Sequence, residues 1–250
     1  MNMYSYRDIA KDDLAKAMDY AAETGFVYIE CSNPFGKSLE EYRDMLKARG
    51  MKPVSRNFGF NDWENKLEET IQQARTLGVK YTGTAWIPFK NKEGNRAITE
   101  EEVRHAAEVI NKAAAELAKF GMKFSIHNHG QEFAPYQDGK TMFDLLMELT
   151  DAENVKVEMD VTWVLHPWGA NPVEVIKKYP NRIRMLHVKD FKQREDGKYG
   201  GSCPVGEGCA NMKEVLKAAQ EAGVEFYHIE DEASQPLKDI PTSLRNMEAM

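Results

Sequence analysis

The 250-residue sequence has few cysteines and no long hydrophobic run. Cys31, Cys203 and Cys209 are an odd number of cysteines without a CxxC spacing, which argues against a disulfide framework and against a zinc ribbon. Cys203 and Cys209 flank a loop rich in glycine and proline, and a disulfide between them in an oxidising compartment is the alternative to the free thiols that we expect. No stretch approaches the roughly 18 uninterrupted apolar residues that a membrane span requires, so we expect no membrane span.

An excess of basic residues is also absent. The chain has 33 Lys and Arg against 40 Asp and Glu, which gives a formal net charge of −7. Because binding to a nucleic acid backbone requires clustered Lys and Arg, we expect no nucleic acid partner and favour a small ligand. The N-terminal segment MNMYSYRDIAKDD has neither the basic nor the apolar region of a signal peptide. We expect a cytoplasmic protein, with an exported protein whose leader was trimmed as the alternative, and a homo-oligomer is compatible with either.

One pattern recurs along the whole chain: an amphipathic helix, a turn signal, and a short run of apolar and β-branched residues. In most copies the turn is a glycine, as in TLGVKYTGT and KFGMKFSIH, because glycine tolerates the left-handed conformation at a helix end. The apolar runs predict eight strands, at Met3–Tyr6, Val27–Cys31, Lys52–Arg56, Val79–Ala85, Met122–His127, Val155–Asp160, Arg184–Lys189 and Glu225–Glu230.

Eight strands that alternate with helices predict an α/β fold of the (β/α)8 TIM barrel type. A doubly wound open sheet is the alternative, but no GxGxxG or Walker A sequence follows any predicted strand. No composition shift or long linker divides the chain. We therefore expect a single barrel domain over residues 1–250.

Polar side chains end most of the predicted strands, where the reacting groups of such a barrel lie. Buried strands should instead be almost entirely apolar, and an unpaired buried charge costs several kcal/mol. These groups must therefore pair with one another, bind a cation or face a wet cleft. The strand-end residues are Arg7, Glu30, Arg56, Asn57, His127, His129, Glu158, Asp160, His187, Lys189, His228, Glu230 and Asp231.

A single divalent metal accounts for several of these residues together. Carboxylate oxygens of Asp160 and Glu230 with the imidazole of His187 suit Mn²⁺, Mg²⁺, Co²⁺ or Zn²⁺ and leave positions open for substrate oxygens. Glu132 and His127 are the candidates for a fourth ligand. The competing interpretations are a loop cap for Asp160, a core histidine for His187, and ion pairs for Glu230 and Glu132.

The other strand-end groups are candidates for proton transfer. Only six histidines occur in the chain, and His127 and His129 stand two residues apart, on the same face of a strand end. His127, His129 and Glu158 are candidate bases, because imidazoles and desolvated carboxylates can titrate near neutrality. Lys189 shares a face with His187 and is a candidate to stabilise an oxyanion or a substrate carboxylate, with an ion pair as its alternative.

Further residues are candidates for substrate binding. Trp86, Trp163 and Trp168 are predicted to form apolar walls on which a sugar ring stacks, with core packing as the alternative for Trp163. Glu30 is expected to form an ion pair with an arginine, Arg7 or Arg56. The substrate-binding candidates are Arg7, Trp86, Trp163 and His166.

Six segments in order, MYSYRD, HNHGQEF, EMDVTW, MLHVKDF, PVGEG and HIEDE, resemble the sugar phosphate isomerase/epimerase group of the xylose isomerase-like TIM barrels. The resemblance covers the chain from Tyr4 to Asn246. It implies one divalent metal at the C-terminal mouth of the barrel, held by a carboxylate, an aspartate, a histidine and a second carboxylate from successive strands. Asp160, His187 and Glu230 match the last three of these ligands.

The first ligand of the family pattern does not match directly. Related ketose epimerases carry a glutamate on the strand where this chain has His127, and the nearest carboxylate here is Glu132, five residues on. The fourth ligand therefore stays open between the two. The departure also weakens the transfer of a two-glutamate epimerisation mechanism to this chain.

The resemblance implies a carbohydrate substrate and a metal-dependent sugar or sugar phosphate isomerase or epimerase, in which a base removes the proton α to a carbonyl and the metal stabilises the enediolate. A lyase or dehydratase that acts on a keto-sugar, a 3-keto-glycoside or an inosose is the alternative, and the histidines at the end of the fifth strand favour it. A non-catalytic sugar-binding barrel is an alternative of another class. Apurinic endonucleases share the barrel type, but their three-metal cluster requires more histidines and a basic groove.

Overall fold

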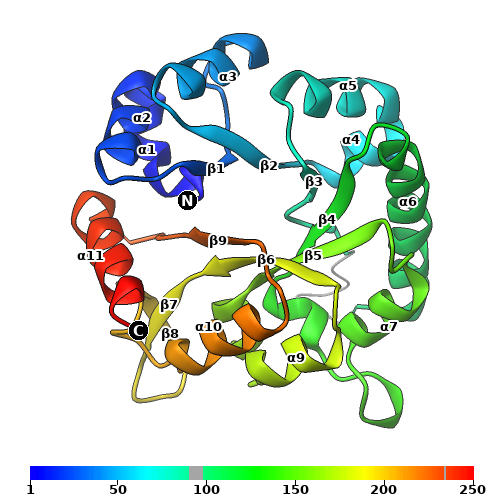
Figure 1. Ribbon diagram of the computed structural model, residues 1–250. Helices are drawn as coiled ribbons and strands as arrows, with labels where there is room; N and C mark the ends of the chain where they lie inside the picture. The colour runs from blue at the N-terminus through cyan, green and yellow to red at the C-terminus, as the bar shows by residue number, and fades with distance from the viewer. Residues whose placement is uncertain (90–97, 234) are drawn as a thin grey trace.

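The computed structural model describes residues 1–89, 98–233 and 235–250. Its main sheet has seven parallel strands: β1 (Tyr28–Cys31), β2 (Lys52–Phe58), β3 (Tyr81–Thr84), β4 (Lys123–His127), β5 (Val155–Asp160), β6 (Ile183–Val188) and β9 (Phe226–Ile229). They lie side by side in the order β1-β2-β3-β4-β5-β6-β9, and the sheet curls into a nearly closed barrel (Figure 1). The predicted TIM barrel class is confirmed.

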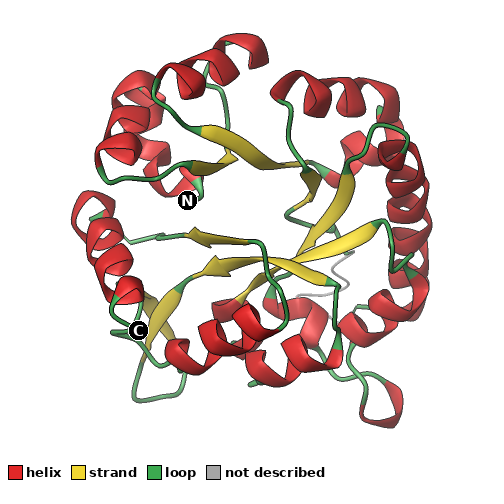
Figure 2. Ribbon diagram, in the orientation of Figure 1, coloured by secondary structure: helices red, strands yellow, loops and turns green. Residues whose placement is uncertain are grey.

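Helices surround the sheet on its outer side (Figure 2). Most connections between neighbouring strands contain at least one helix, as the alternation in the sequence predicts. The helices are η1 (Met3–Tyr6), α1 (Arg7–Asp12), α2 (Leu14–Glu23), α3 (Leu39–Ala48), α4 (Phe60–Asn65), α5 (Leu67–Leu77), α6 (Glu100–Ala118), η2 (Gly130–Phe133), η3 (Gln137–Gly139), α7 (Met142–Leu149), α8 (Val161–Leu165), α9 (Pro172–Lys178), α10 (Met212–Glu221) and α11 (Pro236–Glu248).

The prediction of a first strand at Met3–Tyr6 is wrong, because these residues form the 3₁₀ helix η1. The side chain of Asn2 accepts a hydrogen bond from the backbone N–H of Tyr4 at 2.7 Å and so starts the helix. Asn2 itself is extended. It bridges Glu30 of β1 on one side, and its N–H donates to the carbonyl of Ile229 in β9 at 3.1 Å on the other. The extreme N-terminus thus occupies the place of the eighth strand.

The other predicted strands lie within two residues of the observed ones at each end. The sequence did not predict the antiparallel hairpin of β7 (Asp190–Gln193) and β8 (Tyr199–Cys203), which extends from the end of β6. The carboxylate of Asp190 fixes the loop after this hairpin, because it accepts hydrogen bonds from the backbone N–H groups of Gly206, Gly208 and Ala210. In this way the hairpin and the PVGEG loop form one unit.

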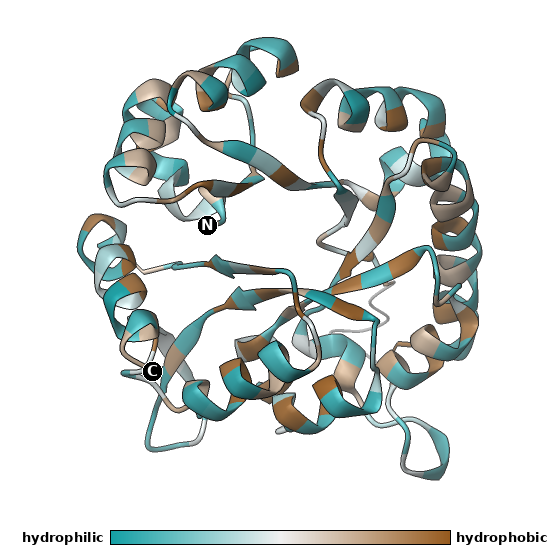
Figure 3. Cartoon of the chain, viewed as in Figure 1, coloured by the Kyte–Doolittle hydropathy of each residue, from teal (hydrophilic) through white to brown (hydrophobic). Residues whose placement is uncertain are grey.

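The central strands alternate between apolar core and polar interior. In β5 the buried Val157 and Met159 alternate with the buried Glu158 and Asp160. Figure 3 shows hydrophobic and hydrophilic segments following one another along the strands. Because successive side chains of a strand point to opposite faces, one face packs against the helices and the other turns polar groups toward the barrel interior.

The expectations about a membrane span and about the cysteines can be compared with the described residues. No helix among them combines the length and the apolar character that crossing a bilayer requires. The three cysteines are free thiols in the structure, with Cys31 buried and Cys209 exposed.

Candidate active site

The register of the parallel strands brings the polar strand ends together. His127 of β4 lies beside Glu158 of β5, and Asp160 of β5 lies beside His187 of β6. His187 in turn pairs with His228 of β9. Carboxylates and imidazoles from four neighbouring strands thus meet at the C-terminal mouth of the barrel, where βα loops begin.

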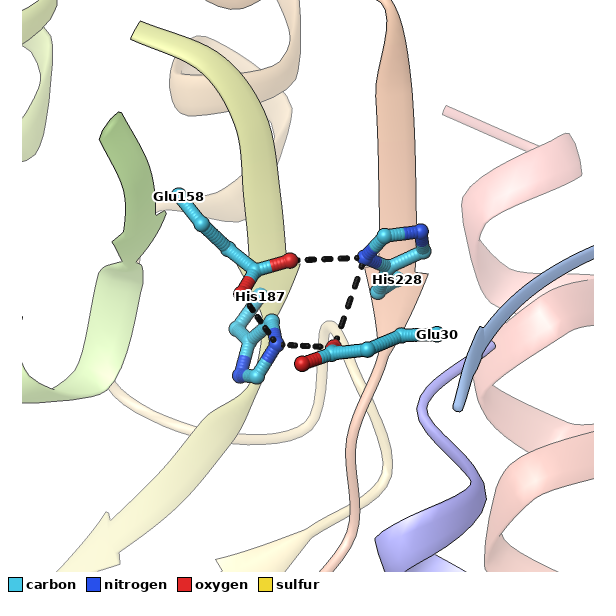
Figure 4. Close-up of side chains that lie close together, drawn as sticks. All are labelled: Glu30, Glu158, His187 and His228. Atoms are coloured by element: carbon cyan, nitrogen blue, oxygen red, sulfur yellow. Dashed lines mark hydrogen bonds and ion pairs between the residues drawn. The ribbon is translucent and has the colours of Figure 1, made fainter. Parts of the chain in front are cut away.

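His187 is the centre of this group. Its Nδ1 lies 2.7 Å from Oε2 of Glu230, and its Nε2 lies 2.5 Å from Oε2 of Glu30. The imidazole is 3% exposed, so both contacts are shielded from water. Glu30 comes from β1, 157 residues away in sequence, and reaches His187 across the barrel (Figure 4).

Glu158 and His228 complete a network beneath His187. His228 Nδ1 lies 2.9 Å from Oε1 of Glu158, and Oε2 of Glu158 lies 3.4 Å from His187 Nε2 (Figure 4). The amide of Asn57 donates to Oε1 of Glu30 at 3.0 Å and to Oε2 of Glu158 at 3.1 Å. Both carboxylates therefore accept hydrogen bonds from more than one donor, as burial requires.

The network places opposite charges close together inside the protein. Burial raises the pKa of Glu30 to about 7, and repulsion from Glu158 adds to this effect. Burial alone would also raise the pKa of Glu158, but attraction to His187 and hydrogen bonds from His187 and His228 hold it well below its usual value. For His187, burial opposes the charged form, yet the surrounding carboxylates raise its pKa well above the usual value. The carboxylates therefore stabilise a positive charge at this point, on the imidazole of His187 or on a bound cation.

Two ligand atoms beside His187 have no hydrogen-bond partner. Oδ2 of Asp160 and Nδ1 of His127 are both buried without a hydrogen bond among the described residues, and each has an ionisable neighbour at 3.9 Å, Nδ1 of His187 and Oε2 of Glu158 respectively. Ligand atoms of His127, Asp160 and His187 all lie within 4.8 Å of one another. An unpaired buried carboxylate oxygen is costly, and burial raises the pKa of Asp160 to about 7. Buried, unpaired oxygen and nitrogen ligands that converge fit a divalent metal.

A second group of ligand atoms also converges within 4.8 Å, from Glu30, Glu158, His187 and His228. These atoms bond to one another or to Asn57, whereas Oδ2 of Asp160 and Nδ1 of His127 in the first group have no hydrogen bond among the described residues. Metal-ligating histidines commonly donate their other ring N–H to a carboxylate, which fixes the tautomer and the ring orientation. The second group therefore fits the supporting layer of a metal site better than the site itself.

Glu132 lies outside both converging groups. Its side chain is buried, and its Oε2 accepts a hydrogen bond from the backbone N–H of His129 at 2.9 Å. The imidazole of His129 in return accepts from the backbone N–H of Glu132, so the two residues cap the short helix η2 reciprocally. The structure thus brings His127, rather than Glu132, next to Asp160 and His187.

A pocket of about 640 Å³ opens onto the candidate metal site. The rings of His127 and His129, whose centroids are 4.9 Å apart, line it together, as their spacing in the sequence predicts. Trp86 forms a further part of the wall, is 41% exposed, and meets the ring of His129 edge-on at 5.0 Å. Glu158 does not line the pocket and is fully buried, which makes it unsuited to take a proton from a substrate.

The remaining predicted residues lie beside the pocket rather than in its wall. Lys189 is fully buried, forms an ion pair with Oε1 of Glu232 at 3.0 Å, and stands over the ring of Trp163. Trp163 stacks on Tyr199 and also approaches His129, while His166 packs near Tyr199. These rings form an aromatic cluster behind the histidine pair, so core packing accounts for much of the surface of Trp163.

The expectation that Glu30 pairs with an arginine is wrong, because His187 and Asn57 are its partners. Arg7 stacks on the ring of Tyr4 at 4.5 Å and donates to the carbonyl of Tyr4, and it does not line the pocket. The prediction of Arg7 as a substrate contact therefore has no support in this geometry.

Almost the whole chain matches one known family. Residues 18–250 match the xylose isomerase-like TIM barrel family. This chain belongs to that family. The membership confirms the resemblance to the xylose isomerase-like barrels that the six sequence segments indicate.

Individual relatives of this xylose isomerase-like barrel have names from two reaction classes. An inosose dehydratase of Geobacillus kaustophilus (strain HTA426) is 28% identical over 189 residues, which are 68% of this chain and 60% of that enzyme, so the match spans less than two thirds of the relative. A crystal structure of a sugar phosphate isomerase/epimerase from Parabacteroides distasonis ATCC 8503 has a TM-score of 0.81 at 21% identity and covers 100% of this chain and 96% of that one. The IOLI protein, whose crystal structure contains a zinc atom, has a TM-score of 0.71 at 19% identity, with 93% and 90% covered. At these identities the two structures show the fold alone.

Sequence reasoning on this xylose isomerase-like barrel missed the roles of Asn57 and His228. Both stood among the polar strand ends, but no partner was assigned to either. His228 lies two residues before Glu230, and Glu158 lies two residues before Asp160. Because residues two apart share a face of a strand, this spacing could have predicted a supporting layer behind the metal ligands.

Proposed function

We propose that this protein is a divalent-metal-dependent dehydratase that removes water from a cyclic keto-polyol of the inosose or keto-sugar type. The relationship to an inosose dehydratase supports this reaction class. The observation that carries the proposal is the pair of His127 and His129, which line the pocket beside His187.

Asp160, His187 and Glu230 would hold the metal. Asp160 offers an unpaired Oδ2, and His187 offers Nδ1, which now lies 2.7 Å from Glu230. Glu30 would keep the proton on Nε2 of His187 and so leave Nδ1 free for the metal. A bound divalent cation supplies Lewis acidity, which polarises a substrate carbonyl and makes the neighbouring C–H more acidic.

His127 is the proposed base. Its ring lines the pocket beside that of His129, and burial, reinforced by repulsion from His187, holds its pKa well below the usual value, so the imidazole is neutral. A neutral imidazole has one nitrogen that accepts a proton. In the proposed reaction His127 takes the proton α to the carbonyl and returns it to the hydroxyl that leaves the β-carbon. A carbon–carbon double bond forms, water departs, and the imidazole ends neutral.

His129 is the proposed hydrogen-bond donor to the departing hydroxyl. Its ring lines the pocket with its centroid 4.9 Å from that of His127, and a neutral imidazole has one N–H group that can donate. Trp86 beside it offers an exposed ring against which the apolar face of a six-membered carbohydrate ring can pack. The pocket thus combines an aromatic wall with two imidazoles, as a polyol substrate requires.

Isomerisation or epimerisation of a sugar is the second candidate, because both begin with the same removal of an α-proton. The two reactions separate in one experiment. The protein is loaded with Mn²⁺, and in parallel with Zn²⁺, Mg²⁺ and Co²⁺, and incubated in D₂O with inososes, keto-sugars, 3-keto-glycosides and sugar phosphates, with products followed by NMR. We expect an unsaturated or diketo product from an inosose or keto-sugar.

Deuterium at the α-carbon with a rearranged sugar and no loss of water would instead establish the isomerase or epimerase. Absence of both exchange and turnover with every metal, in protein shown to be fully loaded, would reject both and indicate a sugar-binding barrel.

A further inference from the structure

Arg56 of β2 lies in the wall of the same pocket as His127 and His129. Its guanidinium stacks on the ring of Phe58 at 4.9 Å, and its Nη1 donates to the carbonyl of Ser32 at 2.7 Å. Both contacts orient the guanidinium, but neither carries a negative charge. An arginine held in this way presents a fixed fork of donors.

Arg56 has no anionic partner among the residues that the structure describes. Its Nε is buried without a hydrogen-bond acceptor. The titratable groups that influence it are Cys31 and Tyr42, and burial raises the pKa of both, to about 12 for Cys31, so that both are neutral near pH 7. A largely buried guanidinium without a countercharge is unfavourable, because the charge has lost water and gained no ion in return.

Ser32 adds a second unsatisfied donor at the same place. Its Oγ is buried without a hydrogen-bond partner in the described structure, and the residue lines the pocket next to Arg56. The backbone carbonyl of Ser32 is already the acceptor for Arg56, which keeps the two side chains together. A guanidinium with an unsatisfied Nε and a hydroxyl without a hydrogen bond match the oxygens of a carboxylate or a phosphate.

We propose that Arg56 and Ser32 form an oxyanion subsite, and that the substrate therefore carries a carboxylate or phosphate group in addition to the part of the molecule that reacts beside His127. This inference rests on the proposed function for the identity of the reacting ring, but the subsite itself binds an anion whether or not a reaction follows. Such a subsite would favour an acidic or phosphorylated substrate over a neutral inosose, which has no anionic group.

The test is calorimetric binding to the full chain loaded with Zn²⁺, using three matched ligands: glucose, glucuronate and glucose 6-phosphate. We expect the wild-type protein to bind one of the two anionic ligands about 10- to 100-fold more tightly than glucose, as a charge-assisted bidentate contact predicts. The comparison of glucuronate with glucose 6-phosphate identifies which oxyanion the subsite prefers. Arg56→Met should remove this preference, so that glucuronate and glucose 6-phosphate bind no more tightly than glucose.

Three further variants serve as controls for this interpretation. Arg56→Lys keeps the charge without the fork and should retain part of the preference, and Ser32→Ala should weaken it severalfold. Arg75→Met is the matched control, because Arg75 also stacks on a phenyl ring, that of Phe120 at 4.3 Å, and does not line the pocket. It should bind all three ligands like the wild type. Thermal unfolding of each variant shows that the fold is intact.

Equal affinity for the anionic and neutral ligands in the wild type, or an equal loss for both in folded Arg56→Met, would overturn the subsite. Turnover of a neutral inosose that Arg56→Met leaves unchanged would also overturn it, while the dehydratase function would stand. Conversely, anion binding that depends on Arg56 in a protein without any turnover would retain the subsite and reject the dehydratase.

Discussion

Replacing Glu30 by glutamine tests whether the buried network holds His187 in the form that binds metal. Oε2 of Glu30 lies 2.5 Å from His187 Nε2, and Oε1 accepts from the amide of Asn57 at 3.0 Å. A glutamine offers one acceptor oxygen and one NH₂ group. Whichever way the amide turns, one of its two neighbours meets a donor instead of an acceptor.

The expected magnitude follows from the hydrogen bond that is lost. A hydrogen bond to a charged group contributes about 1.5–3 kcal/mol, and supporting partners of metal-bound histidines typically change metal affinity by about 10- to 100-fold. We therefore expect Glu30→Gln to bind Zn²⁺ about 10- to 100-fold more weakly. The free energy of unfolding of the metal-free protein should fall by less than the about 1.5–3 kcal/mol that the hydrogen bond contributes, because the substitution also removes the repulsion between Glu30 and Glu158.

The assay is a Zn²⁺ titration against a competing chromophoric chelator, with urea unfolding of the metal-free protein in parallel. Glu174→Gln is the control, because Glu174 is an exposed residue of α9 and does not line the pocket. If folded Glu30→Gln binds Zn²⁺ as tightly as the control, the carboxylate does not position His187 and the supporting layer has no role in metal binding.

Three further predictions follow from the same structure. His187→Ala should remove most of the bound metal in an elemental analysis, and full occupancy in that variant would contradict the proposed ligands. His127→Gln should keep its metal but lose about 10²- to 10⁴-fold in the rate of α-proton exchange with D₂O, as removal of a base does; loss of the metal instead would make His127 the fourth ligand. Although burial alone would raise it, the ion pairs with Lys80 and Arg184 lower the pKa of Glu225 to about 2. The depressed pKa of Glu225 stabilises the folded protein above about pH 4.5, and this stabilisation is lost as the pH falls toward 2. Glu225→Gln should therefore lower the free energy of unfolding at pH 7 by about 1–2 kcal/mol, after allowance for solvent screening. In urea titrations, the free energy of unfolding of this variant should also depend less on pH between pH 5 and 2.

Local periodicity in the sequence was sufficient to predict the barrel. The alternation of amphipathic helices with short β-branched runs depends only on residues close in the chain, and the strand at Val155–Asp160 was predicted with its observed bounds. The period of two along a strand also predicted that His127 and His129 share a face, and their rings line one pocket. These properties follow from backbone geometry, which each segment carries by itself.

The identity of the partners depended on the tertiary structure. Glu30 meets His187 across 157 residues, and Asn57 meets Glu158 across 101, because closure of the barrel brings β1 and β2 opposite β5 and β6. The sequence alone assigned Glu30 to an arginine, which is the commoner partner of a carboxylate. Which of several possible partners a buried charge takes depends on strand register and barrel closure, and neither is encoded in any short segment of the chain.

The backbone conformation of the N-terminal residues also could not be predicted from the local sequence. The run Met3–Tyr6 has the composition of a short strand, yet the cap that Asn2 provides turns it into a 3₁₀ helix. The two residues before it complete the sheet instead, through Asn2, Glu30 and Ile229. Sequence by itself determined the repeated unit and the chemistry at its strand ends. Only the closed sheet decided which of those groups pair and which lack a hydrogen bond, because these outcomes depend on distances between segments far apart in the chain.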